Sequence, residues 1–431
     1  LNNFLEKKHP QIKGIKSGDK IISSADFGIE IPEVISNLEN SYLYIQGPPG
    51  TGKTYQAANA IIKLLRQNKK IAVTGLSHKV IHNLLQRIES MATAKQFNFK
   101  GYKRGTLEDE DTVFNGEYIK TYEKDPIFID ALDEINVGQI FAGTKYHLAS
   151  TFYDQKIDFL FIDEAGQVSL ADLISIGNIA KNIILIGDQN QLGQPIKGSH
   201  PNESGQSILD YLLEGKDTIP IDRGIFLNKT YRLNSKLNEF ISSNFYEERL
   251  ICDEITNKRK IKFNKKSKIK NEGVNYIEMT HKNNVQTSIE EFEIIRDLMK
   301  DMIGLEYDDN GEFKELTVDD FLIISPYNTQ VNLLISKLEE AKIKNPRVGT
   351  IDKFQGQEAP ITIISMTSSD SDTLPRNKEF FFSRNRLNVA ISRAQVSSII
   401  LFNPNLLDSS PRNLDQIKLM NNFFKILNFK I

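Results

Sequence analysis

An eight-residue stretch near the start of the chain has the composition of a phosphate-binding loop. It reads Gly47-Pro48-Pro49-Gly50-Thr51-Gly52-Lys53-Thr54. The glycines let backbone N–H groups approach phosphate oxygens, and a helix that starts behind the loop adds a favourable dipole. Lys53 can reach the β- and γ-phosphates of a nucleotide, and the Thr54 hydroxyl can ligate Mg²⁺. A glycine-rich turn of another α/β protein is the alternative; the full match in a strand–loop–helix context favours the phosphate loop.

An acidic pair and a glutamine follow two later apolar runs. Asp163 and Glu164 come directly after residues 158–162. Asp163 can hold Mg²⁺ directly or through water, and Glu164 can orient and deprotonate the attacking water. Downstream of a phosphate loop, the pair predicts nucleotide hydrolysis. Gln191, after residues 182–186, could touch the γ-phosphate or the water, or it could be a surface loop glutamine.

Two arginines are candidates for a cationic partner of the γ-phosphate, Arg232 and Arg393. Such an arginine finger contributes about 10³–10⁵ in rate. We expect both at a cleft between two domains, facing the loop at 47–54, with Arg393 the stronger candidate. Hydrolysis would then depend on domain closure. An ordinary surface arginine is the alternative for each.

A third cluster, residues 348–358, combines a strand end with hydrogen-bonding side chains. Thr350 and Lys353 suit the backbone phosphates of a nucleic acid. Glu358 suits a ribose hydroxyl or an arginine partner. Phe354 fits either the core or a base-stacking surface, and the core is the preferred interpretation.

Apolar runs and amphipathic stretches supply the elements that hold these residues. Nearly continuous apolar strands are typical of parallel sheets covered on both faces, and such sheets bind ligands at the carboxyl ends of their strands. The first series predicts strands at 42–45, 70–74, 139–144, 158–162 and 182–186, with helices at 55–65 and 80–88. The second predicts strands at 274–279, 321–325, 348–351, 361–366 and 398–402, with helices at 288–302, 329–338 and 384–394.

This pattern predicts an α/β fold with two RecA-like domains, each a parallel sheet flanked by helices. The expected boundaries are an N-terminal segment at 1–40 packed on the first domain, a first domain at 41–224 and a second at 225–431. Residues 91–135 lack the strand–helix rhythm and carry the acidic run 108–111, so we interpret them as a solvated insertion. The basic stretch 258–270 is a solvated loop or a nucleic-acid contact.

Composition limits the remaining classes. The 431 residues carry a formal charge of −2, so nucleic-acid binding must use a local basic channel. The one cysteine, Cys252, excludes a disulfide framework and fits a reducing cytoplasm. The sequence has no apolar run near the about 18 residues that span a membrane.

Taken together, the motifs resemble those of superfamily 1 helicases, in the expected order over roughly residues 41–405. The matching strings are 47–54, 75–83, Gly143-Thr144, 163–167, 187–195, 229–232 with 245–247, 325–330, 348–358 and 386–394. The string at 229–232 is similar to that of the subgroup typified by the nonsense-mediated-decay RNA helicase.

The resemblance implies two RecA-like domains with ATP and Mg²⁺ between them and a single nucleic-acid strand, DNA or RNA, running across both. It implies 5′→3′ movement and a role in DNA repair or nucleic-acid processing. The expected ATP contacts are Gly47, Pro48, Pro49, Gly50, Thr51, Gly52, Lys53, Thr54, Tyr55, Tyr231, Gly356 and Glu358. The expected strand contacts are Ser77, His78, Lys79, Gly143, Thr144, Ser325, Pro326, Tyr327, Thr350 and Lys353. Catalysis would use Lys53, Asp163, Glu164, Gln191, Arg232 and Arg393, and the metal Thr54 and Asp163.

A narrower likeness is to bacterial proteins that fuse a RecB-like nuclease to such a helicase, so a nuclease domain could precede this chain. Two departures stand out: residues 20–40 contain no glutamine to read adenine, and 40 residues are too few for the accessory barrel that often precedes the loop.

Three functions stay open. The leading one is an ATP-driven translocase or helicase. The second is a nucleic-acid-stimulated ATPase switch that remodels without unwinding. A P-loop kinase or unrelated NTPase is the third, and it would lack nucleic-acid stimulation.

Overall fold

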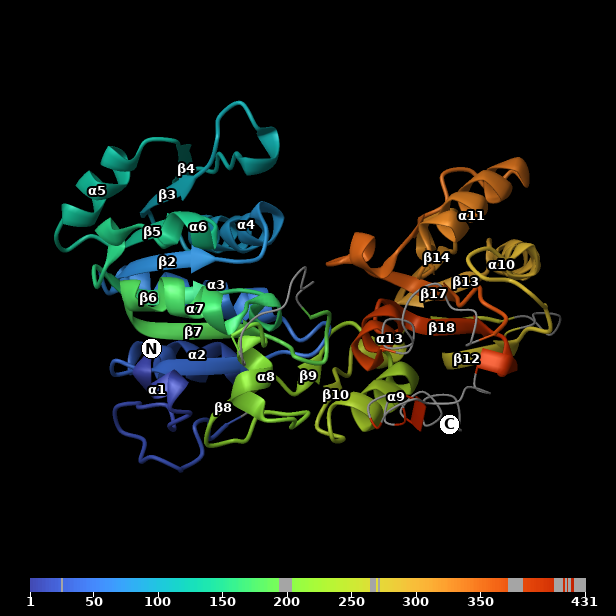
Figure 1. The fold of residues 1–431 in the computed structure, drawn as a ribbon, viewed down its shortest axis with the longest axis horizontal. Coiled ribbons are helices and arrows are strands. Elements are labelled where there is room, and N and C mark those ends of the chain that lie inside the picture. Colours follow the sequence, from blue (N-terminus) through green and yellow to red (C-terminus); the bar gives the residue numbers. More distant parts are fainter. Residues whose placement is uncertain are drawn as a thin grey trace. The chain divides into compact units, whose positions relative to one another are not determined.

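The computed structural model describes residues 1–24, 26–193, 204–263, 269, 272–370 and 383–406, together with 414, 417, 420 and 421. The chain forms two compact units. The first contains 1–48 and 52–227, and the second contains 49–51 and 228–431. Each unit is built on its own parallel sheet (Figure 1).

The described part of the first unit has an eight-stranded sheet in the order β4-β3-β5-β2-β6-β7-β1-β8, with every neighbouring pair parallel. The central strands are almost wholly buried, which is why they read as continuous apolar runs. The strands are β1 (Tyr42–Gln46), β2 (Lys70–Thr74), β3 (Lys100–Arg104), β4 (Ile119–Tyr122), β5 (Gln139–Ala142), β6 (Ile157–Ile162), β7 (Ala180–Gly187) and β8 (Gly224–Phe226).

Helices cover both faces of this sheet (Figure 1). The apolar sides of α2, α3 and α4 share one core with alternate residues of the strands. On the opposite face, Phe128 of α5 and His147 of α6 stack in a ring cluster with Tyr102. The helices are α1 (Asn2–Leu5), α2 (Phe27–Ser36), α3 (Lys53–Arg66), α4 (His78–Ala94), α5 (Asp125–Asp133), α6 (Lys145–Leu148), α7 (Leu170–Ile176) and α8 (Ile208–Leu213).

The N-terminal segment belongs to the same unit. Ile12, Ile21 and Ile31 are buried in the core under α3, and the Tyr42 hydroxyl donates to the Lys8 carbonyl at 2.7 Å. The segment thus closes the face of the sheet beside β1.

Residues 91–135 are not the solvated insertion that the sequence suggested. β3 and β4 extend the parallel sheet beyond β5, and α5 packs over them. A Cβ at Gly101 would lie 2.5 Å from Ile119 of the neighbouring strand, so glycine permits this pairing. Three of the five residues of β3 are basic, so the strand shows no apolar pattern in the sequence, although Gly101 and Lys103 are buried. The acidic run 108–111 is solvated, as expected.

The second unit holds a five-stranded parallel sheet in the order β12-β18-β17-β15-β16 within its described residues. The strands are β12 (Gly273–Glu278), β15 (Phe321–Ile324), β16 (Val348–Gly349), β17 (Ala359–Ser365) and β18 (Ala394–Phe402). The helices are α9 (Ser235–Phe245), α10 (Ile289–Met302), α11 (Asn328–Glu340) and α13 (Arg384–Ile391).

Smaller elements complete the described part of the chain. β9 (Lys229–Thr230) pairs with β10 (Ile251–Cys252), and β11 (Lys260–Ile261), β13 (Glu306–Asp309) and β14 (Glu312–Glu315) form an antiparallel sheet. Single 3-10 turns are η1 (Glu110–Thr112), η2 (Thr151–Tyr153), η3 (Ala165–Gln167), η4 (Gly177–Ile179), η5 (Thr256–Lys258), η6 (Val318–Asp320), η7 (Ile351–Phe354) and η8 (Pro404–Leu406). Among the helices formed by these residues, none has the length and apolar character needed to cross a membrane.

Candidate active site and nucleic-acid interface

The phosphate loop occupies the turn between β1 and α3. Gly50 and Gly52 have φ of 74° and 78°, a left-handed backbone that favours glycine. The N–H of Gly47 donates to the Gly187 carbonyl at 2.9 Å, which fixes the loop to the end of β7. Lys53 begins α3, and its Nζ donates to the Gly47 carbonyl at 2.6 Å. The lysine is therefore folded back over the loop, where a phosphate oxygen could replace the carbonyl as its partner.

The acidic pair lies beside this loop, at the end of β6. The Asp163 N–H donates to the Thr74 carbonyl at 3.0 Å, and Asp163 is buried. Burial and the neighbouring Glu164 charge raise the pKa of Asp163 to about 7, while the nearby Lys53 charge opposes the shift. Glu164 has a φ of 52°, uncommon for a residue with a side chain, and such strain gathers at functional sites.

These residues fit a magnesium ion held jointly with a nucleotide. Asp163 is a carboxylate whose pKa is raised by burial and by the Glu164 charge, and a bound cation would stabilise its charged form. Mg²⁺ typically takes one or two protein ligands plus phosphate oxygens and water. The described residues contain no cluster of three or more His, Cys, Asp or Glu side chains that would hold a metal alone. Thr54, in the first turn of α3, and Asp163 would hold the ion, which would neutralise phosphate charge.

Gln191 is placed by the turn that follows β7. Its Nε2 donates to Asp188 Oδ2 at 3.0 Å. A Cβ at Gly187 would lie 2.9 Å from the Ala165 N, so this turn packs directly on the one after β6. The glutamine is thus one turn away from the acidic pair rather than on a free surface loop. Residues 194 and 195, the end of the expected motif, lie outside the described residues.

A buried amide network beneath the loop was not foreseen. Gln46, the last residue of β1, donates to Gln189 Oε1 at 3.0 Å and accepts from the Ile219 N–H at 2.7 Å. The Tyr44 hydroxyl also donates to Gln189 Oε1, at 2.9 Å. The sequence signals this network in one way, because the polar residue Gln46 ends the otherwise apolar strand β1.

The predicted strand contacts of the first unit follow the next two strands of the same sheet. Gly143 donates its N–H to the Val73 carbonyl at 3.2 Å, which joins the turn after β5 to β2. Ser77 caps α4, and its Oγ accepts from the Val80 N–H at 3.3 Å. Ser77 and Lys79 are exposed, His78 and Thr144 are half-buried, and Gly143 is buried. Ligand contacts can therefore come from five adjacent strand ends, in the order β5, β2, β6, β7 and β1.

Two residues near this edge were missed. Lys103 of β3 is fully buried and places its Nζ 2.7 Å from His78 Nδ1. Burial lowers the pKa of Lys103 to about 8. Tyr146 is 80% exposed and directly follows the Thr144–Lys145 turn, so it offers a ring to a base. Lys103 was hidden in the supposed insertion.

In the second unit, Ser325, Pro326 and Tyr327 follow β15, and Thr350 and Lys353 follow the neighbouring β16. Lys353 is exposed, and its Nζ donates to the Val348 carbonyl at 3.2 Å. Tyr327 is buried, so its ring acts in packing rather than as an open stacking surface. Phe354 is also buried, as the preferred interpretation had it.

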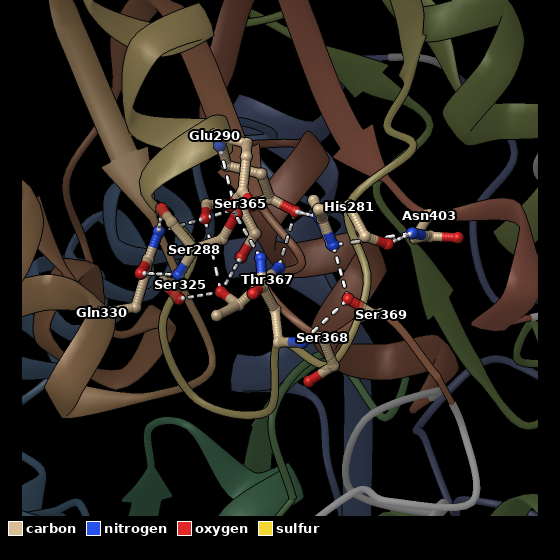
Figure 2. A network of polar contacts seen from close by, with 12 residues as sticks. His281, Ser288, Glu290, Ser325, Gln330, Ser365, Thr367, Ser368, Ser369 and Asn403 are labelled. Atoms are coloured by element: carbon tan, nitrogen blue, oxygen red, sulfur yellow. Dashed lines mark hydrogen bonds and ion pairs between the residues drawn. The ribbon is translucent and has the colours of Figure 1, made fainter.

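A buried polar network contains Ser325 (Figure 2) and also contacts Tyr327. Its centre is Glu291 of α10, which accepts from Ser365 Oγ at 2.5 Å and from the Thr367 N–H at 2.9 Å. Ser325 Oγ lies 3.1 Å from Thr367 Oγ1, and Ser368 Oγ donates to the Tyr327 hydroxyl at 3.4 Å. Burial raises the pKa of Glu291, and the surrounding donors oppose the shift.

The two candidate arginines lie close together in the second unit. Arg232 Nε donates to Glu358 Oε2 at 2.5 Å, and its Nη1 donates to the Ser392 carbonyl at 3.2 Å. Arg393 is buried, and its Nη1 donates to the Gln357 carbonyl at 3.4 Å. Burial alone would raise the pKa of Glu358, but the Arg232 charge and the Gln395 amide bring it below its ordinary value. Glu358 is therefore an arginine partner.

Three residues of the phosphate loop, Pro49–Thr51, belong to this second compact unit. The Tyr231 N–H donates to the Gly50 carbonyl at 2.9 Å, and Thr230 Oγ1 donates to the Pro49 carbonyl at 2.9 Å. A Cβ at Gly50 would lie 2.4 Å from Arg232 Cβ. Within this unit, Arg232 therefore lies next to Gly50.

Of the other expected ATP contacts, Tyr55 and Tyr231 are exposed, and Gly356 has a φ of 80°.

Comparisons with known proteins agree with this arrangement. Two family models, both described as an AAA domain, match residues 33–203 and 205–405. The DNA replication ATP-dependent helicase/nuclease dna2 of Schizosaccharomyces pombe is 28% identical over 394 residues, covering 86% of this chain and 27% of that protein. The DNA polymerase alpha-associated DNA helicase A of the same yeast is 26% identical, covering 81% of this chain and 59% of that protein.

The chain belongs to the superfamily 1 helicases. This confirms the predicted fold of two parallel-sheet domains and the predicted enzyme class, an ATP hydrolase with a P-loop. The helicase/nuclease DNA2 of Gallus gallus is 25% identical over 84% of this chain. This chain spans 27% of the length of the yeast dna2 protein and 35% of the length of the Gallus gallus protein. Among solved structures, an arterivirus nonstructural protein 10 helicase with DNA matches 88% of this chain and 63% of its own, at 14% identity and a TM-score of 0.44. The likeness to RecB-like nuclease fusions stays a prediction.

Proposed function

We propose that this helicase uses ATP to move along single-stranded nucleic acid, with DNA as the favoured strand, in the 5′→3′ direction, and that it serves DNA repair or nucleic-acid processing. The observation that carries the proposal is the shared edge of the first sheet. The phosphate loop, the acidic pair and Gln191 follow β1, β6 and β7, while the predicted strand contacts follow β2 and β5. Nucleotide and strand would therefore contact one rigid element, so that a change at one is felt at the other.

The individual roles follow from the geometry. Lys53 would leave the Gly47 carbonyl and bind phosphate oxygens. Glu164 would accept a proton from the attacking water, and Asp163 would bind Mg²⁺ in its charged form. Arg232 and Arg393 of the second unit would supply positive charge to the γ-phosphate, with Arg393 as the finger. DNA is favoured because the similar proteins are a DNA replication helicase/nuclease and a DNA polymerase alpha-associated DNA helicase.

The decisive experiment is the ATP hydrolysis rate without nucleic acid, with single-stranded DNA and with RNA of the same sequence. We expect strong stimulation by DNA and less by RNA, with Lys53→Ala as the inactive control. Equal rates in all three conditions would mean that no strand is sensed, and the proposed movement along a strand would be wrong. A larger effect of RNA would reverse the choice of strand.

The second candidate is an ATPase switch that clamps a strand without separating a duplex. Within the described residues 1–24 and 26–40, the chain forms α1, α2 and the loops around them. Both candidates predict stimulated hydrolysis, so strand separation has to be measured. The single cysteine, Cys252, favours a reducing compartment such as the cytoplasm for either.

A further inference from the structure

The second unit contains a cavity of about 160 Å³ at the carboxyl ends of β15, β16 and β17, beside α13. One part of its lining is apolar. That part consists of Ile324, Ile351, Ile364, Met366, Leu387 and Ala390. These side chains belong to four separate segments, so the cavity is a product of the fold rather than of one loop.

The rest of the lining is polar. Ser325, Asn328 and Thr350 contribute hydroxyl and amide groups, and Pro326 lies between the first two. Arg386 of α13 donates from Nη1 to Asp352 Oδ2 at 3.3 Å on the same lining. Donors and acceptors are thus present together next to an apolar wall, which is the composition of a pocket for a small polar heterocycle.

The size of the cavity limits what can enter. An apolar cavity of about 150 Å³ holds one benzene molecule, so the space in this one matches a single six-membered ring. Arg386 and Asp352 offset each other's charge on the lining, which favours a neutral group over an anion. A neutral pyrimidine ring, which has both donor and acceptor groups on its edge, satisfies both limits.

We propose that this cavity, the base pocket, receives one pyrimidine base of the bound strand. The proposal rests on the proposed function, because Ser325, Pro326 and Thr350 are predicted strand contacts and also line the pocket. A strand whose backbone lies on these residues has its bases within reach of the cavity. The apolar wall would take the ring face, and Asn328, Thr350 and Arg386 would meet its polar edge. A strand-binding track that mostly ignores sequence would then have one position that prefers pyrimidines.

Homopolymers of equal length test the proposal. Affinities are measured for oligo-dT, oligo-dC, oligo-dA and an abasic oligomer with the same phosphates, without nucleotide. Stacking contributes about 1–3 kcal/mol per base, so the wild-type protein should bind the pyrimidine oligomers at least about fivefold more tightly than the abasic one. Ala390→Leu, which fills the pocket, should bring both pyrimidine affinities down to the abasic value. Affinity for the abasic oligomer should not change, because the phosphate contacts remain.

Two controls separate the possible failures. Ala341→Leu makes the same substitution at the end of α11, outside the pocket, and should keep the pyrimidine preference. Asn328→Ala, at an exposed position, serves if Ala390→Leu does not fold, and should reduce the preference. If all four oligomers bind equally to the wild type, or if Ala390→Leu keeps the preference, the base pocket is wrong while strand binding stands. If no oligomer binds, the proposed function itself fails.

Discussion

Lys53 and Glu164 divide the predicted chemistry between binding and hydrolysis. We expect Lys53→Ala to abolish hydrolysis, because the phosphate charge loses its nearest cation. Glu164→Gln should bind ATP normally but hydrolyse it about 10²–10⁴ times more slowly, because the general base is lost. Nucleotide-binding titrations and single-turnover rates measure the two effects. Lys63→Ala, later on α3, is the matched control for the lysine. Near-normal turnover of Glu164→Gln would remove Glu164 from its role as base.

Substitutions of Arg393 test the prediction that hydrolysis needs both units. Arg393→Ala should lower the hydrolysis rate about 10³-fold while ATP affinity falls much less, because a finger acts mainly in the transition state. Arg393→Lys should also be impaired, since it keeps the charge but loses the planar fork. The measurement is single-turnover hydrolysis with saturating single-stranded DNA, with Arg296→Ala on α10 as the control. A wild-type rate for Arg393→Ala would mean that the first unit hydrolyses ATP alone.

At the scale of elements, the loop after β17 depends on a single buried carboxylate. Thr367 has a φ of 70°, which is costly for a β-branched residue, and its N–H is held by Glu291. Glu291→Ala leaves the Thr367 N–H and the Ser365 hydroxyl without this acceptor, at about 1–3 kcal/mol for each buried group. We expect a clear loss of unfolding free energy in chemical denaturation.

Glu293→Ala is the matched control for Glu291→Ala, because Glu293 is exposed on the same helix. It should leave stability almost unchanged. Binding of the abasic oligomer should weaken in Glu291→Ala alone, since Ser325 and Tyr327 rest on the network. An equal effect of the two substitutions on stability would show that the network contributes little.

A buried histidine of α6, His147, makes the stability of the first unit depend on pH. His147 is buried, and its Nε2 lies 2.8 Å from the Tyr153 hydroxyl. Burial and, to a smaller extent, the Arg104 charge lower the pKa of His147 to about 4, while the Asp125 charge opposes the shift. The unfolded chain therefore binds more protons between pH 6.5 and 4. The contribution of neutral His147 to the free energy of unfolding is complete above pH 6.5 and is lost as the pH falls towards 4, by about 3 kcal/mol at most. Denaturation at pH 7 and pH 5 measures it.

His147→Phe should remove this contribution, because phenylalanine keeps the ring contact with Phe128 and cannot be protonated. The difference in unfolding free energy between pH 7 and pH 5 should be smaller in the variant than in the wild type. The same difference in both proteins would place the acid sensitivity at other groups.

For the whole molecule, the open question is whether ATP turnover separates strands. A helicase that moves 5′→3′ should unwind a duplex with a 5′ single-stranded tail and leave one with a 3′ tail intact. Fluorescence release of a labelled strand measures this, with Glu164→Gln as the inactive control. Hydrolysis stimulated by DNA without release from either substrate would favour the ATPase switch, and release only from the 3′ tail would reverse the direction.

The sequence by itself predicted the chemistry of the first sheet. The loop at 47–54 and Asp163-Glu164 each directly follow an apolar strand, Gln191 lies in the turn after another, and their residue types suit phosphate, metal and water. Strand ends of a parallel sheet meet at one edge, so local strings were enough to predict a shared site. The long apolar strands and amphipathic helices were predicted for the same reason, because their periodicity is local.

Only the tertiary structure decided what residues distant in sequence do together. β3 and β4 looked like a solvated insertion because an edge strand carries charges, and Lys103 became a buried partner of His78 only through β-sheet pairing. Glu291 reads as an ordinary helix glutamate until Ser365 and Thr367 surround it. The base pocket likewise needs four segments at once. Burial and cavity shape are sums over long-range contacts, and no local pattern of residues encodes them.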